Sequence, residues 1–312
     1  MTFTVAASQF VVLLGPSGCG KTTLLKLVNR LYEPTSGTIA INGIDTRSLP
    51  APALRRRIGY VIQQTGLFPH MRVGENVAVV PRLVGWDKRR TAARVDELLE
   101  LVGLPAEEYR RRYPAQLSGG QQQRVGLARA LAAEPSTLLM DEPFGALDAI
   151  TRGRLQDELR HIHGLLGQTV IFVTHDVEEA VRLADRIVVM RDGRIVQDDT
   201  PLRILSHPAD DFVRDLVGAS DVLRRLSLIP VHQAIRSGIP DAADRCPPVT
   251  ASQNLRTALN LLLDCGAPRL VVVDADARPI GTLDLEAIQQ AATVDVASDS
   301  PIVPPDIAPT RR

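Results

Sequence analysis

A glycine-rich segment near the N-terminus has the residue types and the spacing to hold a phosphate chain. It fits the pattern G-x-x-x-x-G-K-[ST], in which glycines let successive backbone N–H groups face one anion. We expect the Lys21 ammonium to reach the outer phosphates of a nucleoside triphosphate and the Thr22 hydroxyl to ligate Mg²⁺. A glycine-rich turn that fits by chance is the alternative, disfavoured because an apolar run precedes the segment and a helical pattern follows it. The candidate phosphate-binding residues are Gly15, Pro16, Ser17, Gly18, Cys19, Gly20, Lys21, Thr22 and Thr23.

Two adjacent acids, Asp141 and Glu142, directly follow the apolar run Leu138–Met140. Ligands of open α/β sheets bind at the carboxyl ends of the strands, so these carboxylates are well placed for chemistry. Asp141 can hold Mg²⁺ directly or through water, and Glu142 can orient or deprotonate an attacking water. Such a pair alone usually marks a solvated loop, but the phosphate-binding pattern upstream favours the functional interpretation.

A second glycine-containing segment, Leu-Ser-Gly-Gly-Gln at 117–121, precedes a predicted helix from Gln121 to about Ala133. Ser118 and Gln121 have the spacing of a capping box, which indicates a helix N-terminus. Glycine in a helix costs about 1 kcal/mol relative to alanine, so Gly119 and Gly120 need a reason. Either the segment is only a well-capped helix, or a second phosphate-binding surface lies here that must approach the backbone closely.

Alternating strands and helices must position these groups. The predicted elements are a strand at 10–14, a helix at 20–31, a hairpin at 37–47 turning at Asn42-Gly43, an amphipathic helix at 91–102, and strands at 138–140 and 170–173. This order implies an α/β fold with a parallel sheet covered on both faces.

The pattern changes after about residue 220. A helix at 255–263 and strands at 270–273 and 279–283 predict a small separate α/β unit. The last twenty residues are Pro-rich and aperiodic, which is typical of a disordered tail. We therefore predict three parts, 1–220, 221–292 and 293–312.

Composition limits the possible functions. The chain has 312 residues, with 36 basic and 36 acidic side chains, and a net charge of zero disfavours nucleic-acid binding. The three cysteines (Cys19, Cys246 and Cys265) show no disulfide or zinc spacing, which favours a reducing compartment. We find no membrane-spanning apolar run and no signal peptide. We expect a soluble, cytosolic chain that would reach a membrane only by docking onto a spanning partner.

Over residues 10–220 the chain resembles the nucleotide-binding subunits of ABC transporters. The motifs that carry the resemblance are the phosphate loop, Leu-Ser-Gly-Gly-Gln at 117–121, Leu-Leu-Met-Asp-Glu-Pro at 138–143, Gly-Ala-Leu-Asp at 145–148, Val-Thr-His-Asp at 173–176 and Tyr-Val-Ile-Gln-Gln at 60–64. The resemblance implies a P-loop ATPase domain with a helical subdomain near 82–112 that receives the membrane subunit.

The same resemblance implies ATP and Mg²⁺ as ligands and a dimer with two composite sites. Glu142, His175 and Gln63 would be the catalytic residues, with His175 on the γ-phosphate. Thr22, Gln63 and Asp141 would hold the metal, and Gln63 would also sense the membrane partner. The residues that would act across the dimer are Ser118, Gly119, Gly120 and Gln121 on the γ-phosphate of the partner's ATP, and Asp148 between the two sites.

Further stretches are similar to importers of osmoprotectants such as glycine betaine, choline and carnitine. They are 59–71, 141–152 and 207–215, and a stretch at 272–285 resembles a cystathionine-β-synthase-type (CBS) regulatory motif. The resemblance implies a peripheral ATPase on the cytoplasmic membrane face, with a permease and an extracytoplasmic substrate-binding protein as partners. An importer of another small solute and a weakly active regulatory subunit are the alternatives. A DNA- or ribosome-directed ABC protein is disfavoured because there is one ATPase unit and no excess positive charge.

The sequence differs from that family in two respects, its N-terminal start and its number of CBS motifs. Family members usually start earlier, with strands and an aromatic residue that stacks on adenine, so the N-terminal strands are expected to be missing here. Either the true start lies upstream or this subunit binds ATP more weakly, and we expect the 312-residue form to have a lower ATP affinity than a form extended upstream. CBS motifs normally occur in pairs, whereas one copy is present here at about 240–292. Two copies could pair in a dimer and sense a nucleotide or ionic conditions, or the motif could be vestigial.

Overall fold

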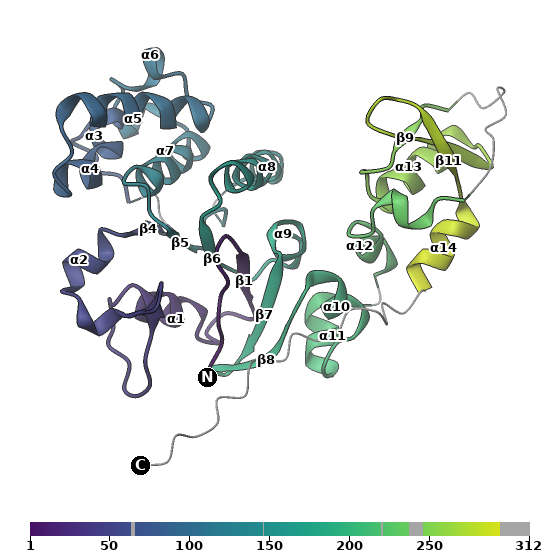
Figure 1. Cartoon of the computed structure of the whole chain (residues 1–312), viewed down its shortest axis with the longest axis horizontal. Helices are drawn as coiled ribbons and strands as arrows, with labels where there is room; N and C mark the ends of the chain where they lie inside the picture. The colour runs from purple at the N-terminus through teal and green to yellow at the C-terminus, as the bar shows by residue number, and fades with distance from the viewer. Residues whose placement is uncertain (64–65, 146, 220, 237–245, 294–312) are drawn as a thin grey trace. The chain divides into compact units, whose positions relative to one another are not determined.

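The chain forms two compact units, Met1–Asp198 and Asp199–Arg312 (Figure 1). The computed structural model describes residues 1–63, 66–145, 147–219, 221–236 and 246–293. Among these residues, no helix combines the length and the apolar character that crossing a bilayer requires.

A six-stranded sheet forms the centre of the first unit, in the order β4-β5-β6-β1-β7-β8. Strands β4, β5, β6, β1 and β7 run parallel, so their carboxyl ends meet at one edge. The strands are β1 (Phe10–Leu14), β4 (Ile58–Val61), β5 (Thr137–Asp141), β6 (Thr169–Thr174), β7 (Arg186–Arg191) and β8 (Arg194–Asp199). The three strands predicted at 10–14, 138–140 and 170–173 are confirmed as β1 and as parts of β5 and β6.

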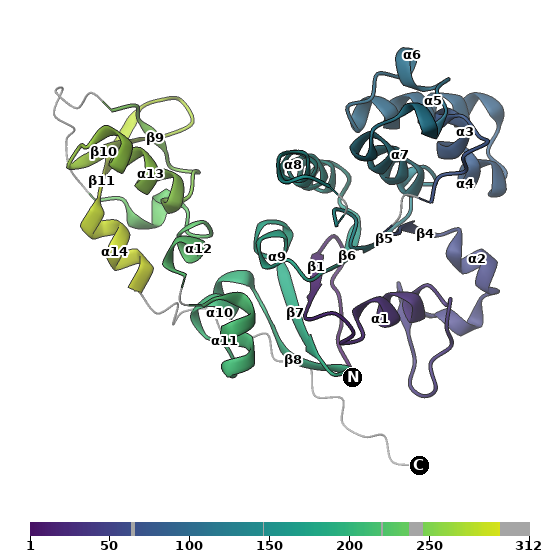
Figure 2. The ribbon, with the colours of Figure 1, turned by 180° about the vertical axis from the view of Figure 1, so that it is seen from behind.

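Helices cover both faces of this sheet (Figures 1 and 2). Alternate residues of a strand point to opposite faces. Val11 and Leu13 of β1 share a buried cluster with Leu25 of helix α1 (Lys21–Val28). On the other face, Phe10 makes an edge contact with His163 of helix α8 (Ala149–Leu166), and helix α9 (Val177–Leu183) packs beside β1 and β6. The parallel sheet covered by helices is therefore confirmed.

The segment between β4 and β5 folds into a group of helices that lie together in Figure 1. They are α3 (Val73–Val77), α4 (Val79–Leu83), α5 (Lys88–Leu101), α6 (Ala106–Tyr109) and α7 (Gly119–Leu131). The helix predicted at 91–102 is α5, which starts three residues earlier because Asp87 accepts a hydrogen bond from the Arg90 amide and caps it. Helix α2 (Ala51–Arg55) and a hairpin of β2 (Ala40–Ile41) and β3 (Ile44–Asp45), turned at Asn42-Gly43 as predicted, complete the first unit.

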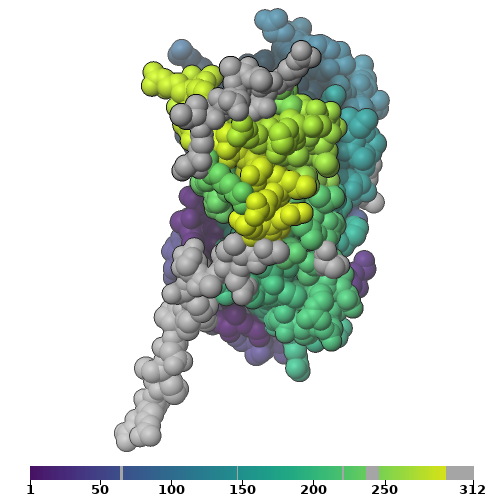
Figure 3. All heavy atoms as spheres, turned by 90° about the vertical axis from the view of Figure 1, so that its right-hand side faces the viewer, coloured from purple at the N-terminus to yellow at the C-terminus, as the bar shows by residue number. Residues whose placement is uncertain are grey.

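The second unit has its own core around a three-stranded sheet, in the order β11-β10-β9. Its elements are α10 (Pro201–Ser206), α11 (Asp211–Val217), α12 (Val222–Leu226), β9 (Val249–Thr250), α13 (Leu255–Cys265), β10 (Arg269–Val273), β11 (Pro279–Asp284) and α14 (Leu285–Thr293). Helix α13 and strands β10 and β11 confirm the predicted helix and strands of this unit. Figure 3 shows the atoms of the second unit in green to yellow, with its last described residues in yellow.

The division between the units lies earlier than the boundary expected at residue 220. It falls after Asp198, because Leu202 of α10 packs against the buried cluster of the second unit and α10 contacts α12. The predicted tail at 293–312 lies outside the described residues, except for Thr293 at the end of α14.

A candidate nucleotide-binding and hydrolysis site

The phosphate loop joins β1 to α1 and encloses the Lys21 side chain. The Lys21 Nζ donates hydrogen bonds to the carbonyl oxygens of Gly15, at 2.6 Å, and of Pro16, at 2.9 Å. Lys21 is only 4% exposed, and the Cys19 Sγ lies 3.8 Å from the Lys21 Nζ. The buried ammonium is therefore held by two carbonyl oxygens and a sulfur atom of the loop itself, and an anionic oxygen can replace these carbonyls as a stronger acceptor.

Two glycines of this loop cannot carry a side chain. A Cβ on Gly15 would lie 2.3 Å from the Met190 carbonyl oxygen, and Gly20 has φ +105°. Gly20 stands at the N-cap position of α1 and has no side chain that could accept a hydrogen bond from the first helical N–H groups. An uncapped helix N-terminus with converging N–H groups is a binding site for an anion.

Thr22 and Asp141 meet at the start of α1. The Thr22 Oγ1 donates a hydrogen bond of 2.8 Å to the Asp141 Oδ1 at the end of β5. Burial raises the pKa of the Asp141 carboxyl, although the Thr22 hydrogen bond acts in the opposite direction. Hydroxyl and carboxylate oxygens beside a phosphate are the ligands that Mg²⁺ prefers, and the cation would offset the charge that Asp141 carries in its buried position. The residues present fit this metal.

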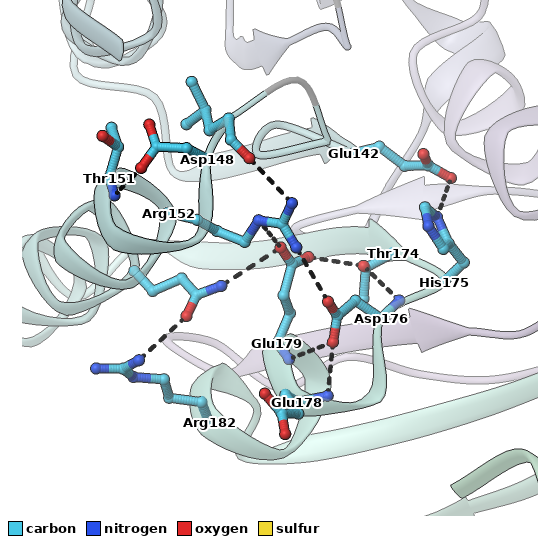
Figure 4. A network of polar contacts seen from close by, with 12 residues as sticks. Glu142, Asp148, Thr151, Arg152, Thr174, His175, Asp176, Glu178, Glu179 and Arg182 are labelled. Atoms are coloured by element: carbon cyan, nitrogen blue, oxygen red, sulfur yellow. Dashed lines mark hydrogen bonds and ion pairs between the residues drawn. The ribbon is translucent and has the colours of Figure 1, made fainter.

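Glu142, His175 and Gln63 lie together at the carboxyl ends of β5, β6 and β4. The His175 Nδ1 is 3.2 Å from the Glu142 Oε1, and these two side chains point toward each other in Figure 4. The Gln63 Nε2 donates to the Glu142 Oε2 at 3.4 Å. Glu142 has φ +44°, a strained value for a residue with a side chain, and its amide donates to the Val173 carbonyl. Two of the residues predicted as catalytic, Gln63 and His175, thus both contact the carboxylate of the third, Glu142.

Helix α7 begins with a complete capping box. The Ser118 Oγ accepts a hydrogen bond from the Gln121 amide at 3.3 Å, and the Gln121 Oε1 accepts one from the Ser118 amide at 3.0 Å. The capping box is confirmed, but the helix spans Gly119–Leu131 rather than Gln121 to Ala133, because Ser118 is the capping residue itself. A Cβ on Gly119 would meet no atom within 4 Å, so space is open beside that backbone.

Asp148 caps helix α8 by accepting a hydrogen bond of 3.0 Å from the Thr151 amide, which lowers the pKa of its carboxyl. A Cβ on Gly120 would lie 2.9 Å from the Thr151 Cγ2. The start of α8 therefore packs against the start of α7, a contact that was not predicted from the sequence.

The predicted site residues separate into two groups. One contains the phosphate loop with Thr23, Gln63, Asp141, Glu142 and His175, and the other contains Ser118, Gly119, Gly120, Gln121 and Asp148. Among the described residues, no hydrogen bond or ion pair directly joins a member of one group to a member of the other.

A polar network around Arg152 was not predicted from the sequence (Figure 4). It links α8 to Thr174, Asp176 and Glu179 at the junction of β6 and α9. Its members lie on different elements of the chain, so local spacing carries no signal for it.

Comparison with known proteins agrees with this geometry. A family model described as "ABC transporter" matches residues 1–145. The chain is 51% identical over 279 residues to the glycine betaine uptake system ATP-binding protein YehX of Escherichia coli, covering 89% of each chain. It is 50% identical over 225 residues to sulfate/thiosulfate import ATP-binding protein CysA 2 of Chromobacterium violaceum, covering 71% of this chain and 59% of that one.

Among solved structures, a dimeric ATP-binding cassette in a post-hydrolysis state bound to ADP and Pi is similar. Its TM-score is 0.58 at 35% sequence identity, covering 64% of this chain and 88% of that chain. The fold, the site motifs and the 51% identity along most of both chains agree. The chain therefore belongs to the ABC transporter family, as an ATP-binding, ATP-hydrolysing subunit.

Proposed function

We propose that this chain energises import of a quaternary amine osmoprotectant, such as glycine betaine, choline or carnitine, through a separate permease. The observation that carries the proposal is the extent of its similarity to a glycine betaine uptake subunit. The 279 aligned residues outnumber the residues of the first unit, Met1–Asp198, so the alignment includes much of the second unit. The sulfate/thiosulfate relative is almost as identical but is aligned over 225 residues.

ATP binds first to the phosphate loop. The uncapped N–H groups of α1 and the Lys21 ammonium contact the phosphates, with Lys21 exchanging loop carbonyls for phosphate oxygens. Thr22, Asp141 and Gln63 would hold Mg²⁺, which would supply positive charge to offset the charge that develops on the phosphate oxygens during transfer.

Glu142 acts as the general base for the attacking water. Its carboxylate accepts the water proton, and the adjacent His175 and Gln63 fix the direction of its two oxygens, since one contact reaches each oxygen. The exposed His175 imidazole also supplies a donor to the γ-phosphate. Phosphoryl transfer depends mostly on such positioning and electrostatic stabilisation.

A second copy of the chain completes each site. Ser118, Gly119, Gly120 and Gln121 approach the γ-phosphate of the partner's ATP, and Asp148 links the two sites. The separation of the site residues into two groups within one chain supports this homodimer, as does the dimeric state of the similar ATP-binding cassette.

The helical subdomain is the surface for the permease. Phe68, Leu83, Val84 and Tyr113 are large apolar residues exposed in this region, at 40–56% of their area. Docking there places the chain peripherally on the cytoplasmic membrane face, and an extracytoplasmic substrate-binding protein delivers the solute to the same complex. The β-α-β-β-α order of β9 to α14 supports a single CBS-like motif in the second unit.

Uptake of labelled solutes tests the proposal. Cells that lack the gene should lose uptake of at least one of glycine betaine, choline and carnitine, and the wild-type gene should restore it. The Glu142→Gln variant should fail to restore uptake. Unchanged uptake of all three solutes, together with loss of sulfate uptake, would instead support the second candidate, an importer of a different small solute.

A further inference from the structure

Arg152 of α8 connects the segment before Asp148 to the segment after His175. Its Nη2 donates a hydrogen bond of 3.0 Å to the Leu147 carbonyl, next to Asp148. Its Nη1 lies 3.3 Å from the Asp176 Oδ2, next to His175. The planar guanidinium fork thus holds two loops at once, which a single ammonium cannot do with the same geometry (Figure 4).

The residues on both sides of His175 are fixed by the same network. The Thr174 Oγ1 accepts a hydrogen bond from the Asp176 amide at 2.9 Å and donates one to the Glu179 Oε2 at 2.7 Å. The Asp176 Oδ1 accepts hydrogen bonds from the amides of Glu178 and Glu179 and caps α9. The backbone that carries His175 is therefore held by side chains on both sides, while the His175 ring itself contacts only Glu142 among these residues.

One pair of atoms in this network, on Arg152 and Glu179, is too far apart to form a hydrogen bond. The Arg152 Nε lies 3.9 Å from the Glu179 Oε1, beyond hydrogen-bond distance, and this buried nitrogen has no hydrogen-bond partner among the described residues. An unpaired buried donor is unfavourable. Glu179 is only 4% exposed and Gln156 of α8 also donates to its Oε1, at 3.3 Å, so the carboxylate is already oriented toward α8. A movement of about 1 Å at the start of α8 would close the contact.

We propose that Arg152 is a positioning residue for hydrolysis, which transmits the position of the Leu147-Asp148 segment to His175 through Asp176 and Glu179. This inference rests on the proposed roles of Asp148 and His175. When a partner subunit displaces the Asp148 segment, Arg152 moves with it and shifts the backbone of His175 toward the position that serves Glu142. ATP binding to the phosphate loop does not involve Arg152, so the effect falls on turnover.

Steady-state ATP hydrolysis by the purified full-length chain tests this inference, with Arg152→Met compared with Arg154→Met. Arg154 is exposed on the same helix and has no hydrogen bond or ion pair among the described residues, so its variant controls for loss of an arginine from α8. We expect Arg152→Met to lower kcat about 10-fold with KM for ATP unchanged, and Arg154→Met to change neither. Arg152→Lys should recover only part of kcat.

A double-mutant cycle with His175→Ala separates positioning from general destabilisation. If Arg152 acts through His175, then Arg152→Met should lower single-turnover hydrolysis in the wild-type background but have little further effect in the His175→Ala background. Fully additive effects would overturn the inference, as would equal kcat values for the Arg152→Met and Arg154→Met variants. A rise in KM with unchanged kcat would also overturn it.

The same cycle distinguishes the failure of this inference from failure of the proposed function. If His175→Ala hydrolyses ATP as fast as the wild type, the proposed role of His175 is wrong, and the inference falls with it. If His175→Ala is strongly impaired and Arg152→Met is not, only the role of Arg152 is wrong.

Discussion

Two helix N-termini of the first unit follow glycine-rich segments, and they are built differently. At α1, the N-cap residue Gly20 provides no side-chain cap for the first helical N–H groups. At α7, Ser118 and Gln121 cap each other's backbone amides. The first N–H groups of α1 are therefore available to an anion, whereas the start of α7 is already capped by its own side chains.

This difference indicates when each helix contributes. The phosphate loop has a buried ammonium and uncapped amides, so it is prepared to bind ATP within a single chain. In the proposed dimer, the Leu117–Gln121 segment would exchange its existing hydrogen bonds for contacts with a phosphate. We therefore expect its contribution to appear only when two chains close around ATP, and to affect turnover more than binding.

The largest expected effect comes from Glu142→Gln. The amide cannot accept the proton of the attacking water, so hydrolysis should fall by about 100- to 10,000-fold. ATP affinity should stay close to that of the wild type, because the phosphate loop is intact. Hydrolysis is measured by phosphate release and affinity by titration calorimetry, and retained hydrolysis would refute the assignment of Glu142 as the base.

Lys21→Met, at the start of the first helix, should instead weaken ATP binding itself. Loss of the only buried lysine removes a charge-assisted contact and should weaken ATP binding about 10- to 100-fold. Lys88→Met is the matched control, since Lys88 is exposed at the start of α5. Equal ATP affinity of the two variants would contradict the role of the phosphate loop.

Ser118→Ala should distinguish capping from catalysis at the second helix. Loss of the cap should destabilise the first unit by about 1 kcal/mol, and loss of the hydroxyl should lower turnover without changing ATP affinity in the monomer. Asp87→Ala removes a comparable cap from α5 and should lower only the melting temperature. If the two variants lose stability and turnover alike, α7 has only a structural role.

The sequence predicted the chemistry of both helices but not the contacts between elements. The phosphate loop, Asp141 and Glu142 follow local patterns whose spacing is fixed by one strand and one turn, and the capping box lies within four residues. The Arg152–Asp176 pair requires α8 to pack beside α9 across 24 residues of chain. The positive φ of Glu142 and the packing of Leu202 into the second unit likewise depend on tertiary structure, which spacing alone does not contain.

The smallest expected effect concerns stability and pH. Burial raises the pKa of Asp141, so the nucleotide-free folded state binds this proton more tightly than the unfolded state. Above the raised pKa the buried carboxylate lowers stability, and this penalty disappears as pH falls through that pKa. Asp141→Asn should therefore raise the melting temperature at neutral pH, by on the order of 1 °C, and have no effect in acid.

Asp148→Asn should act in the opposite direction. The Thr151 amide lowers the pKa of Asp148, so its charge stabilises the fold above the unfolded-state pKa, and that contribution is lost as pH falls through the folded-state pKa. Thermal melts of both variants between acid and neutral pH measure these signs. Shifts of the same sign for the two variants at neutral pH would contradict the electrostatic description of the two carboxylates.

The association state of the Glu142→Gln variant tests most directly whether a second copy completes each site. Sedimentation analysis of the purified full-length chain should show dimers with ATP and Mg²⁺, and monomers without nucleotide. Adding Lys21→Met to this variant should prevent the ATP-dependent dimer. A Glu142→Gln protein that binds ATP and remains monomeric at high concentration would contradict the account.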